Sequence, residues 1–258
     1  MRNIKLTIEY DGTNYAGWQT QRVKVKTVQL TVEKALKKIL GKKVNLIAAG
    51  RTDSGVHAIG QGANFKTFAK IPLKNIKAAL NSLLPKDIVV REIEETGIDF
   101  HSQYQAKAKL YRYCISNLPQ RPALSRDYLC YSPYKLDIRL MRKEAKGLVG
   151  RHDLKSFCAT GSRTKDTVRN IKRISIKKLP FYLSPFTFHP NNYHLIVIDI
   201  EANGFLYNMA RNIAGTLVEI GRGKFLAGSM KKILKAKDRK AAGPTMPAKG
   251  LCLMKVKY

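Results

Sequence analysis

The chain has 258 residues, 44% of them hydrophobic, which is enough apolar material for one large domain or two modest ones around a real core. It carries 48 Lys and Arg against 18 Asp and Glu, a formal charge of +30 that points to a polyanionic partner, in particular a nucleic acid. No apolar run approaches the ~18 residues of a membrane span and no hydrophobic signal opens the chain, so we expect no membrane association. The scattered cysteines lead us to expect a cytoplasmic protein.

The first 103 residues predict strands and helices in the order β-α-β-β-α-β, which is typical of a ferredoxin-like half. Thr27 is the expected N-cap of the first helix and Gly41 its end, and the second helix lies between Pro72 and Pro85. The expected strands cover residues 1–10, 44–49, 63–67 and 88–93, and the expected helices cover 28–40 and 73–84.

Residues 104–258 repeat this theme loosely and predict a second α+β half, which indicates an internal duplication and one core shared by both halves. This half holds 31 of the 48 basic residues but only half of the acidic ones. The strand at 168–176 mixes β-branched and basic side chains, so we expect it to carry exposed cations, Arg169 among them. The other expected strands cover 109–115, 193–200 and 251–256, and the expected helices cover 138–149, 205–220 and 230–236.

One octet, residues 50–57, stands out as a candidate site: Gly50-Arg51-Thr52-Asp53-Ser54-Gly55-Val56-His57. Its two glycines allow a sharp turn and a close approach by another molecule. Asp53 beside Arg51 is a candidate nucleophile or base, because a cation braces the carboxylate. The ordinary alternative is that Asp53 closes a turn or caps a helix. Residues 58–65 read as extended chain, however, so no following helix needs that cap.

Two further segments carry side chains suited to RNA. Lys109, Tyr111 and Tyr113 share one face of a strand, where rings can stack on unpaired bases and the cation can meet phosphate. Tyrosines packed against a helix are an equally good explanation. Arg211 lies at the margin of the apolar stripe of helix 205–220, where it is either a surface cation or the ion-pair partner of a carboxylate.

Together these segments resemble the TruA family of tRNA pseudouridine synthases over nearly the whole chain. The octet resembles the catalytic loop of that family, and Ala210 departs from it, since a bulkier aliphatic residue is usual there. The resemblance implies two ferredoxin-like α/β halves that form a continuous, mostly antiparallel sheet with a central basic cleft. The other landmarks follow in the same order: Glu9–Thr13, Gly17–Gln19, Thr27–Gln29, Leu84-Pro85, Tyr111–Tyr113, Asn203–Phe205 with Met209–Asn212, and Gly250-Leu251.

The resemblance also implies a role for each matching residue. Asp53 is the expected nucleophile, Tyr111 the ring that stacks on the uracil and helps in proton transfer, and Arg211 the ion-pair partner of Asp53. Arg51 is expected to fill the stack that the flipped nucleotide leaves, and Leu251 to line the uracil pocket. The complete set of expected substrate-binding residues is Arg51, Thr52, His57, Gln61, Lys109, Arg169 and Leu251.

The expected activity is isomerisation of uridine to pseudouridine at positions 38, 39 and 40 of the tRNA anticodon stem-loop, by a homodimer. We expect no cofactor and no metal, because the reaction needs no redox change and the sequence has neither a nucleotide-binding glycine loop nor paired metal ligands. The four cysteines are scattered, which also excludes a disulfide framework: Cys114, Cys130, Cys158 and Cys252.

Two alternatives stay open at the level of sequence. Charge alone favours a non-catalytic RNA-binding protein, against which stands the braced carboxylate of Asp53. A related synthase acting on another RNA shares all the chemistry. The segment at 180–192, with three prolines and three phenylalanines, has no assigned role.

Overall fold

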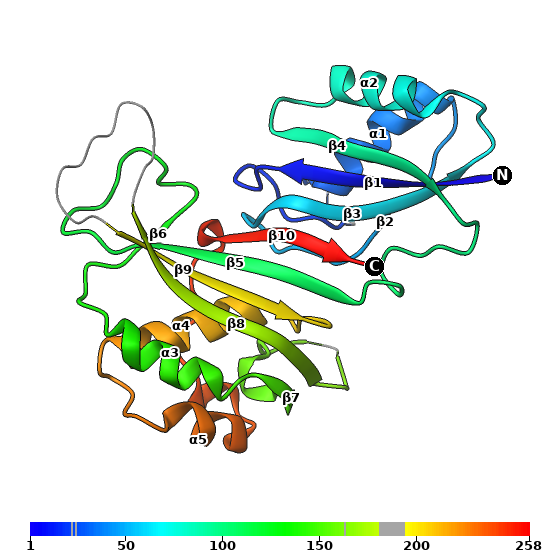
Figure 1. Cartoon of the computed structure of the whole chain (residues 1–258). Helices are drawn as coiled ribbons and strands as arrows, with labels where there is room; N and C mark the ends of the chain where they lie inside the picture. Colours follow the sequence, from blue (N-terminus) through cyan, green and yellow to red (C-terminus); the bar gives the residue numbers. More distant parts are fainter. Residues whose placement is uncertain (22, 24, 163, 181–193) are drawn as a thin grey trace. The chain divides into compact units, whose positions relative to one another are not determined.

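The computed structural model describes residues 1–258 except 22, 24, 163 and 181–193, and it divides into two compact units (Figure 1). The first consists of Met1–Lys109 together with Cys252–Tyr258, and the second of Leu110–Leu251. The sequence placed a boundary between residues 103 and 104 and assigned the closing strand to the second half. The fold groups that strand with the first unit instead.

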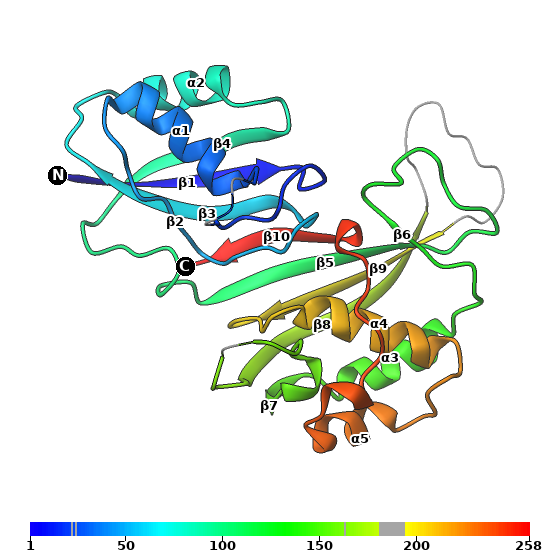
Figure 2. The same ribbon diagram turned by 180° about the vertical axis from the view of Figure 1, so that it is seen from behind.

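The first unit is an antiparallel sheet with the strand order β4-β1-β3, extended by β2 on β3. Both views of the ribbon show α1 and α2 on the same face of these strands (Figures 1 and 2). The predicted β-α-β-β-α-β order of a ferredoxin-like half is therefore confirmed. The elements are β1 (Arg2–Tyr10), α1 (Val28–Leu40), β2 (Ile47–Ala48), β3 (His57–Thr67), α2 (Leu73–Leu83) and β4 (Ile88–Thr96), and β10 (Leu251–Lys257) pairs in parallel with β3.

Local sequence explains both ends of α1. The Thr27 side chain accepts a hydrogen bond from the backbone N–H of Leu30, which caps the amino end. Gly41 takes a left-handed conformation, φ = 71°, and its N–H donates to the carbonyl of Lys37. The predicted limits of this helix are thus confirmed, because each depends on contacts within one turn.

The second unit holds the strand order β5-β9-β8-β7, in which β7, β8 and β9 pair antiparallel. With β10 added, its elements follow the same chain order as the first half, apart from the extra strands β6 and β7 and the extra helix α5. The expected mostly antiparallel α+β class is confirmed. The elements are β5 (Ala108–Ser116), β6 (Cys130–Tyr131), α3 (Ile138–Lys146), β7 (Gly150–Asp153), β8 (Val168–Pro180), β9 (His194–Ala202), α4 (Met209–Gly221) and α5 (Ser229–Ala236).

Several predicted limits differ from the observed ones. The helix expected from residue 205 begins at Met209, because Asn208 has a left-handed backbone, φ = 58°, that a helix cannot continue through. The strand expected at 44–49 shortens to β2. Of the segment at 180–192, only Pro180 belongs to the described residues. The first residue of the strand expected at 193–200 also lies outside them.

Candidate active site

The octet forms the loop that joins β2 to β3, and β3 begins at its last residue, His57. Asp53 therefore precedes a strand and caps no helix, as the sequence predicted. The loop turns at Ser54 and Gly55, where the N–H of Val56 donates to the carbonyl of Asp53 over 3.2 Å. Gly55 has φ = 76°, in the left-handed region that favours glycine.

A second segment clamps the loop through backbone atoms. The N–H of Trp18 donates to the carbonyl of Thr52 over 3.1 Å, and the N–H of Gly55 donates to the carbonyl of Tyr15 over 3.3 Å. A Cβ at Gly17 would lie 2.7 Å from the carbonyl oxygen of Thr52, and one at Gly12 would collide with the carbonyl of Val56. The two chain segments therefore approach more closely than any residue but glycine allows, which holds Asp53 in a fixed frame.

Three expected substrate-binding residues support this loop from beneath. Thr52, His57 and Gln61 are all buried. The hydroxyls of Thr52 and Tyr10 lie 2.8 Å apart, His57 Nδ1 accepts the N–H of Gly12 over 3.0 Å, and Gln61 Nε2 donates to the carbonyl of Gly50 over 2.8 Å. These contacts give the three residues a structural role that sequence reasoning missed.

Burial raises the pKa of the Tyr10 phenol well above its usual range, with a smaller opposing effect from the hydrogen bond to Thr52. The phenol therefore stays protonated at neutral pH and can donate to Thr52. Tyr10 in turn packs against the buried Trp18, with ring centroids 5.9 Å apart. Tyr10 and Trp18 thus give Thr52 a neutral aromatic support.

Three charged side chains lie in or next to the loop: Arg51, Asp53 and Lys109. Asp53 is half-buried and Arg51 is exposed. Lys109 comes from the start of β5 and crosses to the loop, since its Nζ would lie only 3.1 Å from a Cβ at Gly50. All three residues belong to the first unit. A cation from a distant part of the sequence therefore joins Arg51 at the mouth of the Asp53 loop.

In the second unit, the two tyrosines of β5 have different surroundings. Tyr111 is 7% exposed and meets the ring of Phe205 edge-on, with centroids 4.7 Å apart. Tyr113 is fully buried, its hydroxyl donates to the carbonyl of Pro247 over 2.8 Å, and a Cβ at Gly250 would lie 2.6 Å from its ring. Tyr113 is therefore a packing residue, and it fixes the chain just before Leu251, which is itself buried.

Arg211, in the first turn of α4, is a fixed cation rather than a mobile surface one. Its Nε donates to the carbonyl of Met246 over 2.7 Å, and Nη1 donates to Oδ1 of Asn208 over 2.8 Å. Since Asp53 lies in the first unit and Arg211 in the second, their ion pair stays a prediction.

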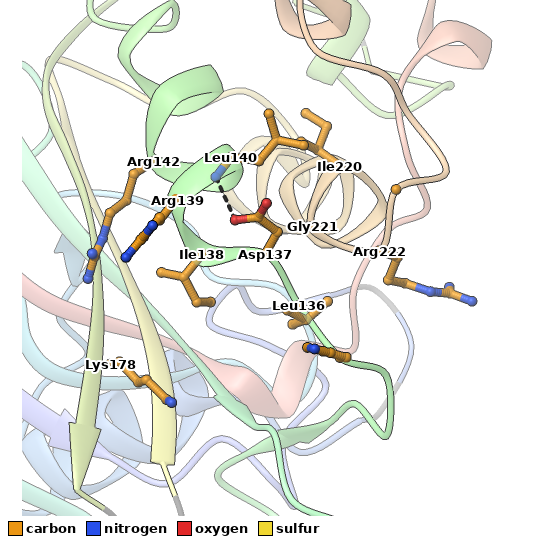
Figure 3. A pocket seen from close by; sticks show the side chains of 12 residues that line it. Leu136, Asp137, Ile138, Arg139, Leu140, Arg142, Lys178, Ile220, Gly221 and Arg222 are labelled. Atoms are coloured by element: carbon orange, nitrogen blue, oxygen red, sulfur yellow. Dashed lines mark hydrogen bonds between the residues drawn. The ribbon is translucent and has the colours of Figure 1, made fainter.

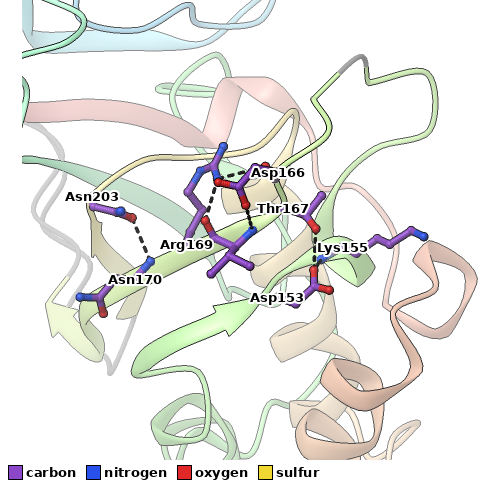
Figure 4. A network of polar contacts seen from close by, with 8 residues as sticks. Asp153, Lys155, Asp166, Thr167, Arg169, Asn170 and Asn203 are labelled. Atoms are coloured by element: carbon purple, nitrogen blue, oxygen red, sulfur yellow. Dashed lines mark hydrogen bonds and ion pairs between the residues drawn. The ribbon is translucent and has the colours of Figure 1, made fainter.

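Arg169, at the start of β8, is held by its own segment (Figure 4). Its Nη1 donates to the carbonyl of Val168 over 2.7 Å and forms an ion pair with Asp166 at 3.7 Å, so the side chain is only 18% exposed. Its Nε would lie 3.2 Å from a Cβ at Gly204, in the turn after β9. Arg169 thus shapes that turn, and the exposed cations of the strand are Lys172, Arg173, Lys177 and Lys178.

Within the described residues, no three His, Cys, Asp or Glu side chains gather so that they could hold a metal ion. The four cysteines are free thiols. No helix in the described part of the chain is long and apolar enough to cross a membrane.

Comparison with known proteins matches most of the chain to one family. A family model described as tRNA pseudouridine synthase matches residues 6–105 and 145–258. Two curated relatives named tRNA pseudouridine synthase A are 48% and 49% identical to the chain, from Caldicellulosiruptor bescii and Caldicellulosiruptor saccharolyticus. A third, tRNA pseudouridine synthase A 2 of Clostridium perfringens, is 46% identical, and all three alignments cover 100% of both sequences.

Proposed function

The chain belongs to the tRNA pseudouridine synthase family, and from that premise we propose that it isomerises uridine to pseudouridine at positions 38, 39 and 40 of the tRNA anticodon stem-loop. The reaction breaks the bond between C1′ and N1, turns the uracil and rejoins it through C5. No atom is gained or lost except the exchanged proton, so the reaction requires neither a cofactor nor a metal. We also propose that the enzyme acts in the cytoplasm as a homodimer that binds tRNA in a basic cleft between the two halves of each chain.

Asp53 is the proposed nucleophile, and Arg211 its proposed ion-pair partner. A carboxylate attacks the sugar or the base, or supports a glycal-type intermediate, only when it is ionised. A guanidinium beside it favours the ionised form and offsets the cost of removing the charge from water. The two hydrogen bonds that hold Arg211 support this role, because they orient the guanidinium before any substrate arrives.

Tyr111, Arg51 and Leu251 are the proposed contacts of the extruded nucleotide. Atoms of a stacked base are out of reach, so the uridine must leave its stack at a cost of a few kcal/mol. Tyr111 presents a ring braced by Phe205, and the exposed Arg51 can fill the vacated space. Phosphate contacts made by the basic second half can offset the remaining cost.

The observation that carries the proposal is the frame around Asp53. Its loop is clamped by backbone contacts to Tyr15 and Trp18 and closed from beneath by buried polar groups. Asp53 caps no helix, and its carboxylate lies in a loop that also carries Arg51 and is approached by Lys109. Preorganisation of this kind favours a catalytic carboxylate over an ordinary turn residue.

Replacing Asp53 tests the proposal. Tritium at C5 of uridine is released when C5 bonds to the sugar, so wild-type protein should release it from labelled tRNA. Asp53→Asn should abolish release while tRNA affinity stays within about twofold, because one carboxylate adds little to a phosphate-driven affinity. Asp99→Asn, an exposed acid of the same unit, is the matched control and should keep full turnover.

Turnover by Asp53→Asn would remove Asp53 from the chemistry. Tight tRNA binding without tritium release by the wild type would favour the non-catalytic RNA-binding protein. Release from another RNA only would favour the related synthase. Mapping pseudouridine in tRNA from cells that lack the protein identifies the modified positions.

A further inference from the structure

The second unit has a cation-lined hollow where the amino end of α3, the carboxyl end of α4 and the strand β8 meet (Figure 3). Its volume is about 790 Å³. We call it the α3 groove and define it by its five basic lining residues: Lys135, Arg139, Arg142, Lys178 and Arg222. Neither the octet nor any residue proposed to touch the uracil takes part in it.

Little within the groove neutralises its positive charge. The single acidic lining residue, Asp137, accepts the N–H of Leu140 over 2.9 Å and caps α3. Arg222 is balanced by Glu219, with Nη1 2.7 Å from Oε1. In the described part of the chain, Arg139 and Lys178 have no acidic side chain within ion-pairing distance, and both are exposed. The groove therefore keeps a net positive field.

The floor of the groove indicates what kind of anion fits. Its buried side chains, Leu136 and Ile220, are apolar, whereas four of its five basic side chains are exposed. A specific small-molecule site needs convergent polar groups within the pocket. Exposed cations along a rim instead match evenly spaced phosphates that stay in contact with water.

The groove lies at the far end of α4 from Arg211, the proposed partner of Asp53. Arg211 stands in the first turn of α4 and Gly221 at its end, so the groove and Arg211 lie at opposite ends of this helix. Gly221 follows Arg211 by ten residues, which is about 15 Å along the helix axis.

We propose that the α3 groove binds the sugar–phosphate backbone of the tRNA substrate, about 15 Å from the base held near Arg211. The inference rests on the proposed function, since that function supplies the RNA. The groove adds sequence-independent affinity and orients the tRNA, and it takes no part in the chemistry.

The test is a double variant, Arg139→Gln with Lys178→Gln, measured with an unmodified tRNA transcript. We expect affinity to fall on the order of tenfold at low salt, and the slope of log K against log salt to decrease by about 2, roughly one for each phosphate that the variant no longer neutralises. KM should rise while kcat stays unchanged. The matched control is Lys34→Gln with Lys38→Gln, which removes the same charge from the exposed side of α1 and should bind tRNA like the wild type.

Wild-type affinity in the groove variant, or an equal loss in the α1 control, would overturn the proposal. A change of oligomeric state by light scattering in the groove variant would assign the groove to a contact between copies and also overturn it. The binding assay is independent of turnover. A wild-type protein that binds tRNA through the groove but releases no tritium would contradict the proposed reaction and leave the groove in place.

Discussion

At the scale of the residue, Asn208 carries out two tasks for Arg211. Its left-handed backbone conformation sets the residue at which α4 begins, and its side-chain oxygen accepts a hydrogen bond from the guanidinium of Arg211. In Asn208→Gly the backbone still adopts φ > 0 without strain, and only the side-chain oxygen that accepts from Arg211 is lost. We expect this variant to keep its thermal midpoint and tRNA affinity, while kcat falls on the order of tenfold through loss of one charge-assisted hydrogen bond.

A second variant at this position distinguishes an effect on the orientation of Arg211 from an effect on stability. Asn208→Asp restores an oxygen acceptor and should recover most of kcat. A glycine variant with wild-type kcat would show that the carbonyl of Met246 alone positions Arg211. A large drop of its thermal midpoint would show instead that Asn208 acts through stability.

At the scale of the element, the helix α5 is capped by a residue of α3. The carboxylate of the buried Glu144 accepts the N–H groups of Gly228 and Met230 over 2.8 and 3.0 Å. Gly228 has no side chain to cap its own helix, so Glu144→Ala leaves two donors without a partner and should lower the free energy of unfolding by about 2 kcal/mol. Urea unfolding measures the loss, and Glu144→Gln should lose about half as much. Lys143→Ala, on the exposed face next to it, should change stability by less than about 0.5 kcal/mol; an equal loss there would contradict the capping role.

At the scale of the whole molecule, the last seven residues complete the first unit from the far end of the chain. Cys252 pairs with His57 at the end of the octet, and the carbonyl of Lys257 accepts the N–H of Lys107 over 2.8 Å. The ring of Tyr258 lies edge-on to Phe100, with centroids 5.0 Å apart. A C-terminal residue thereby stabilises the unit that carries Asp53.

We therefore expect Tyr258→Ala to destabilise the first unit by about 2 kcal/mol through loss of a mostly buried ring. Hydrogen exchange should accelerate at the backbone amides of β3. Tyr104→Ala, whose ring is 80% exposed in the same unit, is the control and should leave exchange unchanged. Faster exchange confined to the second unit would contradict the assignment of the closing segment.

Local patterns in the sequence predicted most elements correctly. Thr27 and Gly41 delimit α1 because capping depends on neighbours within one turn. The predicted start of α4 was wrong. The apolar spacing that begins at Phe205 continues into the helix, but the left-handed backbone of Asn208 prevents helical geometry before Met209. Periodicity records which side chains face the core, and it does not record where the chain leaves helical geometry.

The candidate site divides in the same way. The sequence by itself identified the octet, Asp53 at its centre and extended chain after it, and the resemblance over the whole chain gave the family. Only the tertiary structure decided that Thr52, His57 and Gln61 support the loop and that Lys109 reaches it. It also decided that Glu144 caps another helix and that five cations line one groove. Composition and residue spacing determine local conformation and net charge. Contacts between residues tens of positions apart form only when the chain folds, because the cost of closing a loop depends mainly on its length and does not indicate which residues will meet.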